Sequence, residues 1–456
     1  MGEVATVIGG GTPKSDQPEY FGGDIPWITP ADLSGYTEKF ISVGARSITQ
    51  AGLDNSGARV MPAGAVLFSS RAPIGYVAIA ANPVSTNQGF KTFVLRDGLT
   101  SDFVYYYLQH AKKLAVEMAS GTTFLEISGK KAAQLPIPIA SLPEQRRIVA
   151  EIEKQFTRLE AGVAALRRVQ ANLKRYRAAV LKAACEGRLV PTEAELQKSE
   201  GRGQKSKAGY ETGEALLARI LTERRQNWQG RGKYKEPAAP DTTNLPSLPE
   251  SWTWVSWEMV LAHEDGAFKR GPFGSALTKA IFVEKGFKVY EQYCPINDDC
   301  SFARYYITPE KFEELQAFEV KAGDYLISCS GVTLGRITRV PEQFERGIIN
   351  QALLRVRINE SVINHRYFLH LFRSALFQKA IFDNSTGSAI PNVKGVKELK
   401  AMAIPLPPLA EQTRIVAEVE RRLSVVEELE SVVSANLQRA TRLRQSILQR
   451  AFSGKL

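Results

Sequence analysis

The chain has 456 residues, of which 44% are hydrophobic and 23% charged, and its formal net charge is +11. This length predicts about two to four domains, and this composition excludes a disordered protein. No apolar run of about 18 residues and no signal peptide are present, so the sequence predicts a cytoplasmic protein without a membrane span. The positive charge is compatible with a polyanionic partner, but charge alone does not decide whether that partner is a nucleic acid.

The sequence contains no recognisable catalytic, metal or cofactor motif. Its four cysteines lack paired zinc spacing and predict free thiols in a reducing compartment. There is no phosphate-binding loop and no dinucleotide-binding glycine motif, and Ser128-Gly129-Lys130 lacks the upstream glycine of a phosphate loop. The sequence therefore predicts no catalytic residue. A nuclease centre built from dispersed carboxylates would leave no motif, so it stays open.

Residues 1–140 predict a globular domain of short strands followed by a helix. β-rich runs at 65–68, 76–79 and 91–95 alternate with glycine and proline, and a helical run follows at Ser101–Met118.

Residues 141–189 predict one long helix. Between Pro143 and Ala184 the only glycine is Gly162, and apolar residues recur at steps of three and four, which is a heptad-type stripe of about five heptads. Pro143 suits the first helical turn, and Gly187 suits a helix end.

Residues 190–245 are polar and predict a linker with an amphipathic piece near Glu214–Trp228. Residues 246–407 predict a second domain that repeats the pattern of the first. Its β-rich runs and the helical run that follows them lie at 325–328, 336–340, 352–356 and Asn364–Phe382.

Residues 408–456 repeat the long helix. One copy opens at Leu142 with L-P-E-Q-R-R-I-V-A-E-I-E and the other at Leu409 with L-A-E-Q-T-R-I-V-A-E-V-E, and the offset of 267 residues holds without a gap. Two widely spaced copies do not make a solenoid. Because each apolar stripe must be buried, we expect the helices to pack as an antiparallel coiled-coil pair; alternatively, each packs only on its own domain. The predicted fold class is α+β, with two mixed α/β domains and pseudo-twofold symmetry.

Two related units on long helices, a basic charge and no catalytic motif predict a two-site DNA reader. Divergent loops would read base edges while lysine and arginine contact phosphates. Two other hypotheses stay open: a scaffold that joins proteins without reading sequence, and a stand-alone nuclease with dispersed carboxylates.

Several motifs resemble the specificity subunits of type I restriction-modification systems. They are the doubled helix start with its proline-rich lead-in, the turns Gly10-Gly11-Thr12-Pro13 and Gly271-Pro272-Phe273-Gly274-Ser275, and the run Leu248-Pro249-Glu250-Ser251-Trp252. The resemblance implies that each domain is a target recognition domain for one half of a bipartite DNA target. It also implies that the helices set the spacing between the halves and dock two methyltransferase subunits.

The same resemblance implies a chain that is not an enzyme by itself. Methyltransferase partners would modify adenine with S-adenosylmethionine, and restriction or motor subunits would cleave unmodified double-stranded DNA with ATP and Mg²⁺. These cofactors would be bound by the partners, and the complex would defend its host against foreign DNA.

Loops at strand ends provide the DNA-binding candidates, because loops held by a scaffold carry most contacts. They are Lys14, Ser15, Ser69, Ser70 and Arg71 in the first domain, and Lys269, Arg270, Ser275, Lys279, Ser328, Ser330, Thr333 and Arg336 in the second. Each could equally be an ordinary solvated loop residue. Asn87 and Gln88 could pair with adenine edges. Asn350 and Gln351 stand at the matching place of the second domain, however, which favours a structural role.

The polar starts of the two long helices provide candidates for methyltransferase docking. They are Glu144, Gln145, Arg147, Glu411, Gln412 and Arg414. The repeated pattern could equally be a capping arrangement.

One difference separates the two domains. The second has an entry segment, Leu248–Trp257, before Glu258-Met259-Val260, whereas Gly2-Glu3-Val4 opens the first. The sequence therefore predicts either a shortened first domain or an entry strand that is supplied differently.

Overall fold

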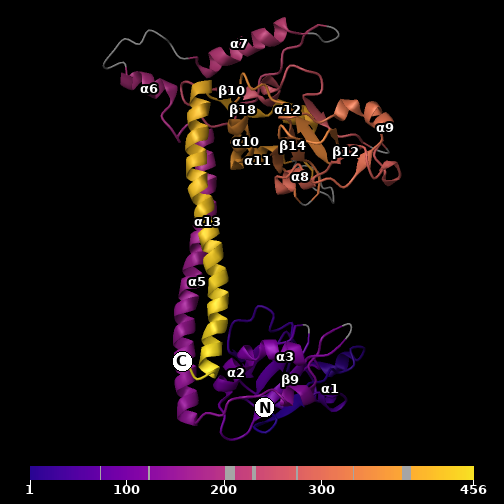
Figure 1. Cartoon of the computed structure of the whole chain (residues 1–456), viewed down its shortest axis with the longest axis vertical. Coiled ribbons are helices and arrows are strands. Elements are labelled where there is room, and N and C mark those ends of the chain that lie inside the picture. The colour runs from indigo at the N-terminus through magenta and orange to yellow at the C-terminus, as the bar shows by residue number, and fades with distance from the viewer. Residues whose placement is uncertain are drawn as a thin grey trace. The chain divides into compact units, whose positions relative to one another are not determined.

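The computed structural model describes residues 1–71, 73–121, 124–200, 211–228, 233–273, 276–331, 333–382 and 392–455. They form two compact units, one made of Met1–Val169 with Val432–Leu456 and the other of Gln170–Ser431. Each unit contains a globular part and parts of two long helices (Figure 1). Ser275 lies outside the described residues.

The two long helices are α5 (Leu142–Cys185) and α13 (Leu409–Phe452), each of 44 residues. They run antiparallel, as ion pairs within each unit show. In the first unit Arg444 of α13 lies 2.9 Å from Glu160 of α5. In the second unit Arg177 of α5 lies 3.2 Å from Glu430 of α13. These ion pairs confirm the predicted antiparallel pair.

The described residues of the first unit form two sheets and four short α-helices. The predicted strands are confirmed, but the predicted helix over 101–118 is interrupted at Ala111, where ψ is 0°. The five-stranded sheet has the order β1 (Ala5–Gly9), β9 (Phe90–Leu95), β6 (Val66–Ser69), β7 (Val77–Ala80), β3 (Phe40–Ile41). The four-stranded sheet has the order β4 (Arg46–Ile48), β2 (Phe21–Ile28), β8 (Val84–Thr86), β5 (Val60–Met61). The helices are α1 (Gln50–Asp54), α2 (Ser101–His110), α3 (Lys112–Met118) and α4 (Gly129–Ala133).

The globular part of the second unit repeats this plan with one more sheet. Its four-stranded sheet has the order β11 (Phe268–Arg270), β17 (Leu353–Val356), β14 (Tyr325–Ser328), β15 (Ile337–Arg339). A three-stranded sheet has the order β13 (Tyr306–Ile307), β12 (Phe287–Tyr290), β16 (Gly347–Ile349), and β10 (Thr253–Ser256) pairs with β18 (Ala403–Leu406). The helices are α6 (Glu193–Glu200), α7 (Gly213–Gln226), α8 (Tyr293–Asn297), α9 (Pro309–Glu314), α10 (His365–Arg373), α11 (Ala375–Ile381) and α12 (Val396–Ala401).

Both long helices contribute to the hydrophobic core of each unit. In the first unit, Phe156 of α5 packs edge-on against Tyr106 at 5.8 Å, and Phe452 of α13 packs against Phe103 at 5.2 Å. In the second unit, Val180 of α5 and Val419 of α13 belong to the cluster that contains Tyr367 and Phe368. The apolar stripes therefore bury themselves both against each other and against the globular parts.

A buried glutamine at the start of each long helix ties that helix to its globular part. In the first unit, Gln145 Nε2 donates to Gly98 O at 2.7 Å and Gln145 Oε1 accepts from Thr100 N at 2.9 Å. In the second, Gln412 Nε2 donates to Val362 O at 3.0 Å and Gln412 Oε1 accepts from Asn364 N at 2.7 Å. Both side chains are fully buried, so these hydrogen bonds have no competition from water.

All four cysteines are buried and none forms a disulfide. Within the described part of the chain, no helix has the length and apolar content needed to cross a bilayer.

Replacing either buried glutamine by leucine should destabilise the unit that contains it. Gln145→Leu and Gln412→Leu each leave a buried N–H and buried carbonyl groups without partners, which costs about 2–4 kcal/mol. Urea unfolding read by hydrogen exchange of each unit would measure this. Gln170→Leu, at an exposed position of α5, is the control and should change the stability by less than about 0.5 kcal/mol. Equal effects of all three changes would contradict the role given to the buried pair.

Candidate nucleic-acid interface

Three loops meet at one end of the five-stranded sheet in the first unit. A Cβ atom at Gly10 would overlap the Asn87 carbonyl oxygen, so only glycine lets the turn after β1 approach the loop before β9. Asn87 Oδ1 accepts from Gly89 N at 2.9 Å, and Gly89 O accepts from Ser70 N at 2.7 Å. The loop after β6 is thereby joined to the other two.

The second unit builds the same junction. A Cβ atom at Gly271 would overlap the Asn350 carbonyl oxygen. Asn350 Oδ1 accepts from Ala352 N at 3.1 Å, and Ala352 O accepts from Cys329 N at 2.9 Å. The structural role predicted for Asn87 and Asn350 is confirmed, because both side chains close the same turn.

Two of the predicted DNA-binding serines, Ser69 and Ser328, stabilise the loops by hydrogen bonds and are not exposed at the surface. Ser69 Oγ donates to Pro73 O at 2.7 Å and accepts from Tyr76 N at 2.8 Å. Ser328 Oγ donates to Thr333 O at 2.9 Å and accepts from Arg336 N at 3.0 Å. Both serines are fully buried, as is Ser70, so their hydroxyl groups are closed to a ligand in this conformation.

The other described DNA-binding candidates have exposed or partly exposed side chains. Lys14, Ser15, Lys279 and Arg336 are exposed, and Arg71, Lys269, Arg270, Ser330 and Thr333 are partly exposed. Arg71 lies 3.6 Å from Glu126, and the Arg270 guanidinium donates to Asn392 Oδ1 at 2.8 Å. Arg71 and Arg270 are therefore held in place by neighbouring side chains, and part of each side chain remains exposed to solvent. Their contact with DNA stays a prediction.

Sequence reasoning missed the partners that hold the strand-end loops. Glu126 forms a β-bridge with Arg71, and its carboxylate lies 3.0 Å from the Lys91 ammonium. In the second unit, Asn392 forms a β-bridge with Ser330. No local signal in the sequence identifies Glu126 or Asn392, since both are brought to the loops by chain segments distant in sequence.

The docking candidates at the helix starts differ in exposure. Gln145, Gln412 and Glu411 are fully buried and bonded within the chain. Arg414 pairs with Glu193. Glu144 and Arg147 are exposed and pair with each other at 3.6 Å, so they are the members of this set that a partner could reach. The docking role of all six stays a prediction.

A cleft of about 670 Å³ lies between the long helices and the globular part of the second unit. Arg177, Arg336, Arg373 and His370 line it. Arg177 and Arg373 pair with acidic groups, whereas the Arg336 side chain has no ion pair or hydrogen bond within the described part of the chain. Burial lowers the pKa of His370 to about 4, although the nearby Glu420 carboxylate opposes this shift.

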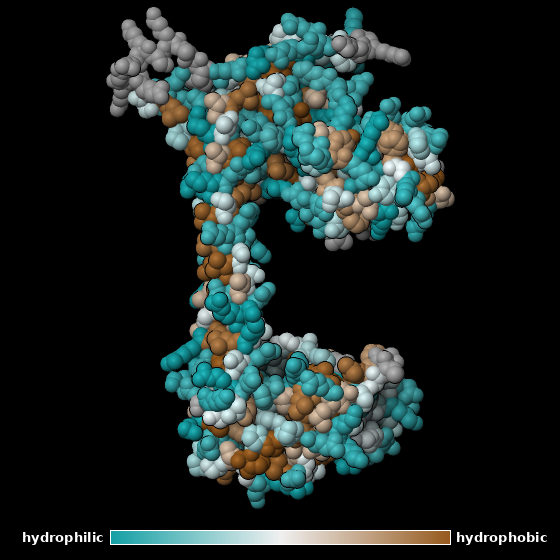
Figure 2. Space-filling model, in the orientation of Figure 1, coloured by the Kyte–Doolittle hydropathy of each residue, from teal (hydrophilic) through white to brown (hydrophobic). Residues whose placement is uncertain are grey.

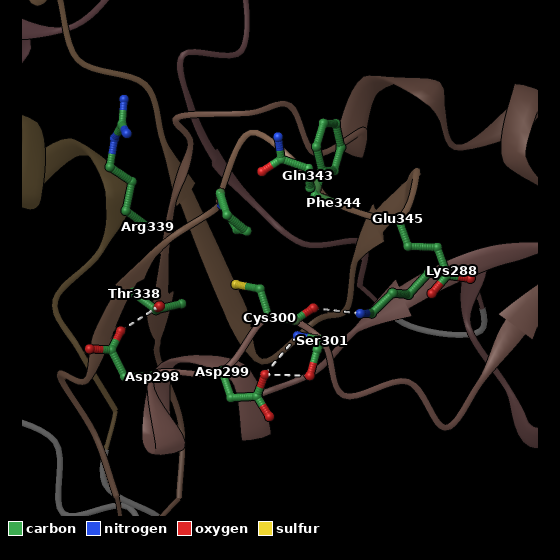
Figure 3. Close-up of a pocket in the computed structure, with 11 residues that line it drawn as sticks. Lys288, Asp298, Asp299, Cys300, Ser301, Thr338, Arg339, Gln343, Phe344 and Glu345 are labelled. Atoms are coloured by element: carbon green, nitrogen blue, oxygen red, sulfur yellow. Dashed lines mark hydrogen bonds between the residues drawn. The ribbon is translucent and has the colours of Figure 1, made fainter.

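A second cavity of about 700 Å³ lies beside β12 and β15, and none of the predicted site residues lines it (Figure 3). Several of its polar groups bond one another. Lys288 Nζ donates to Cys300 O at 2.6 Å, and Thr338 Oγ1 donates to Asp298 Oδ1 at 2.6 Å (Figure 3). Within the described residues, no group of three or more His, Cys, Asp or Glu side chains could hold a metal ion.

Comparisons with known proteins agree on one family. Residues 1–165 and 274–430 match the model of the type I restriction modification DNA specificity domain. The type I restriction enzyme MjaIX specificity subunit of Methanocaldococcus jannaschii is 43% identical over 148 residues, which are 32% of this chain and 34% of that protein. The EcoBI specificity subunit of Escherichia coli is 24% identical over 82% of this chain and 70% of that protein. The chain thus spans about a third of the first relative's length and somewhat over two thirds of the second's.

One solved structure shares the fold. It is described as the structural basis underlying complex assembly and conformational transition of the type I R-M system. Its chain is 18% identical, has a TM-score of 0.62, and matches 100% of this chain and 97% of its own length.

Gly10→Ala should disrupt the loop junction of the first unit, because the added methyl group collides with the Asn87 carbonyl. We expect a loss of about 1–3 kcal/mol in stability and increased hydrogen exchange at residues 86–90. Gly9→Ala is the matched control, since a Cβ atom at Gly9 would meet nothing within 4 Å. A Gly10→Ala chain as stable as the Gly9→Ala chain would show that the turn does not need this close approach.

His370, whose Nε2 atom is buried, should make the second unit less stable in acid. Its pKa in the folded state, about 4, lies below the ordinary value of about 6.5. The unfolded chain therefore binds the proton first, and stability falls as pH drops from about 6.5 toward 4. We expect a loss of about 1–2 kcal/mol at pH 5, which His370→Phe should abolish. Melting temperatures of both proteins at pH 7.5 and pH 5 would measure it, and parallel losses in both would assign the effect to other groups.

Proposed function

The chain belongs to the type I restriction modification DNA specificity family, and we propose that it is the DNA-reading specificity subunit of a type I restriction-modification complex. Each globular unit then reads one half of a bipartite target. The chain itself does not catalyse methyl transfer or cleavage.

The observation that carries this proposal is the pair of matching loop junctions with different side chains. Gly10 and Asn87 in one unit, and Gly271 and Asn350 in the other, hold the loops in the same way. The cations on these loops differ, since the exposed Lys14 and the partly exposed Arg71 have no identical counterparts in the second unit. A common scaffold with different loop side chains is what two different half-sites require.

The long helices suit two roles in such a complex. A helix of 44 residues is about 66 Å long, and we propose that its length sets the spacing between half-sites. The helices also carry exposed apolar side chains, among them Tyr176, Val425 and Leu429 in the second unit. Figure 2 shows hydrophobic surface, in brown, along the long helices. We propose that these apolar side chains belong to the surface on which two methyltransferase subunits dock.

The remaining chemistry belongs to these partners in our proposal. Methyltransferase subunits bind S-adenosylmethionine, and restriction or motor subunits bind ATP and Mg²⁺. The assembly acts on double-stranded DNA in the cytoplasm.

Co-expression with a partner methyltransferase, followed by mapping of methylated adenine in host DNA, tests this function. We expect one split motif with a methylated adenine in each half, and no methylation by the chain alone. Methylation by the isolated chain would contradict a non-catalytic role. A soluble complex that methylates no specific motif would favour a scaffold.

Arg336→Ala should weaken the binding of target and random duplex alike, by several-fold. A phosphate contact carries no base information, and its loss should reduce the salt dependence by about one released ion. Fluorescence anisotropy of the complex at several salt concentrations would measure both. Arg219→Ala makes the same charge change on α7 and should leave binding unchanged. If Arg336→Ala alters only the preference at one base pair, Arg336 contacts a base.

A further inference from the structure

Each globular part carries an exposed phenylalanine beside its loop junction. Within the described residues, Phe124 and Phe273 are the most exposed of the large hydrophobic side chains, at 74% and 68%. A single exposed apolar side chain is common on a protein surface, so exposure alone assigns no function. What distinguishes these two is their surroundings, because each lies on a loop that is fixed to a junction and flanked by cations.

The loop that carries Phe124 is closed at its base and fastened to the junction of the first unit. Ser120 N donates to Glu126 O at 3.1 Å, and Glu126 N donates to Ser120 O at 3.0 Å. Directly after this pair, Ile127 N donates to Ser70 O at 3.1 Å. Ser70 belongs to the loop after β6, which is one of the three junction loops. The Phe124 loop is therefore anchored to the same scaffold as the predicted DNA-binding residues.

Cations surround the base of this loop. Arg71 forms a β-bridge with Glu126 and lies 3.6 Å from its carboxylate, and the Lys91 ammonium lies 3.0 Å from the same carboxylate. Lys131 Nζ donates to Ser120 Oγ at 3.3 Å. Three cations thus stand against one carboxylate, and the base of the loop has a net positive charge that favours an anionic partner.

The second unit places an aromatic ring beside an arginine at its own junction. The Arg270 guanidinium lies 5.5 Å from the centre of the Phe273 ring and donates to Asn392 Oδ1 at 2.8 Å. Asn392 forms a β-bridge with Ser330, as Glu126 does with Arg71. Phe273, however, comes from the loop after β11. The two units therefore combine an exposed ring, an arginine and a bridged loop, with the ring supplied by different loops.

An exposed ring among cations suits an opened DNA duplex better than a protein surface. Every base has a face on which an aromatic ring can stack, and the cations can contact the phosphates on either side. In an intact duplex the neighbouring base pairs cover these faces. They become accessible where an apolar side chain separates a base step or where a methyltransferase extrudes its target base.

We propose that Phe124 and Phe273 each insert into the base stack of one half-site and fill the space from which the target adenine is extruded. The ring stacks on the adjoining base pair, while Arg71 or Arg270 contacts a neighbouring phosphate. Each ring acts in its own half-site, because it belongs to the junction of its own unit. This inference rests on the proposed DNA-reading function and adds to it the residues that hold the duplex open.

The test uses the full chain in complex with its methyltransferase partner and the mapped target duplex. The fluorescent analogue 2-aminopurine replaces the target adenine of one half-site at a time, because its emission rises when it leaves the stack. We expect Phe124→Ala to lower the ratio of extruded to stacked base about tenfold in one half-site and to leave the other unchanged. Phe273→Ala should show the reverse pattern. Phe124→Tyr and Phe273→Tyr keep a ring and should retain most of the signal.

Phe40→Ala is the matched control in the first unit. Phe40 is 49% exposed and lies in β3 level with Ile79, which pairs with Val66 at the start of β6. The junction loop leaves the other end of β6, so this change removes an exposed ring from a different part of the same sheet. We expect it to leave the emission from both half-sites unchanged.

A duplex with a mismatched target base separates insertion from general DNA contact. Such a base is already partly unstacked, so Phe124→Ala should lose less affinity for the mismatched duplex than for the paired one. Equal losses for both duplexes, or equal loss of emission from both half-sites in one variant, would overturn insertion at a single half-site. Unchanged emission from both alanine variants would overturn it as well.

Two other results would overturn the inference for different reasons. Release of methyltransferase subunits from the Phe124→Ala or Phe273→Ala complex would place that ring in a protein interface. A wild-type complex that extrudes the analogue from neither half-site and methylates no specific motif would instead contradict the proposed function, and the inference would fail with it.

Discussion

The burial of two apolar helix stripes is the constraint on which the rest of this structure depends. In each unit, both long helices contribute side chains to a hydrophobic core cluster that they share with the globular part. In the first unit these include Phe156 from α5 and Phe452 from α13. Since each helix contributes to both units, the antiparallel pair and the two cores stabilise one another. The buried Gln145 and Gln412 also fix the orientation of each helix against its globular part, because each amide bonds several backbone groups at once.

The internal repeat shows that identical residues at matching positions can differ in burial and in the interactions of their charged groups. Glu144 and Glu411 occupy the same place in the repeated motif. Burial raises the pKa of Glu411, against the effect of its hydrogen-bond donors, because the carboxylate is removed from water. Glu144 keeps its hydration and a surface pairing that contributes little. The difference comes from residues outside the repeat, which either cover the carboxylate or leave it open.

Much of the architecture could be predicted from the sequence, because it rests on periodicity. The apolar stripe predicted the start of both long helices within one residue, although each observed helix ends four residues earlier than predicted. β14 was predicted at its observed bounds. The interruption at Ala111 could not be predicted, because no glycine or proline marks it. The site was less accessible to sequence reasoning. Ser69 and Ser328 were predicted as DNA-binding residues of the strand-end loops. Only the folded chain shows that their hydroxyl groups already bond backbone groups across each loop.

In each loop junction, the groups that fix the loop are different from the side chains that face outward. This division suits a protein that reads a DNA sequence. The groups that hold each loop are buried: Ser69 and Ser328 close their turns, and glycine permits close approach of backbones. The side chains that face outward, such as Lys14 and Arg336, contribute little to these bonds. Exposed side chains away from buried networks usually change stability by less than about 0.5 kcal/mol when replaced. Loop tips of this kind can therefore change their chemistry while the junction beneath them keeps its geometry, so two units with one fold can present different surfaces to two different half-sites.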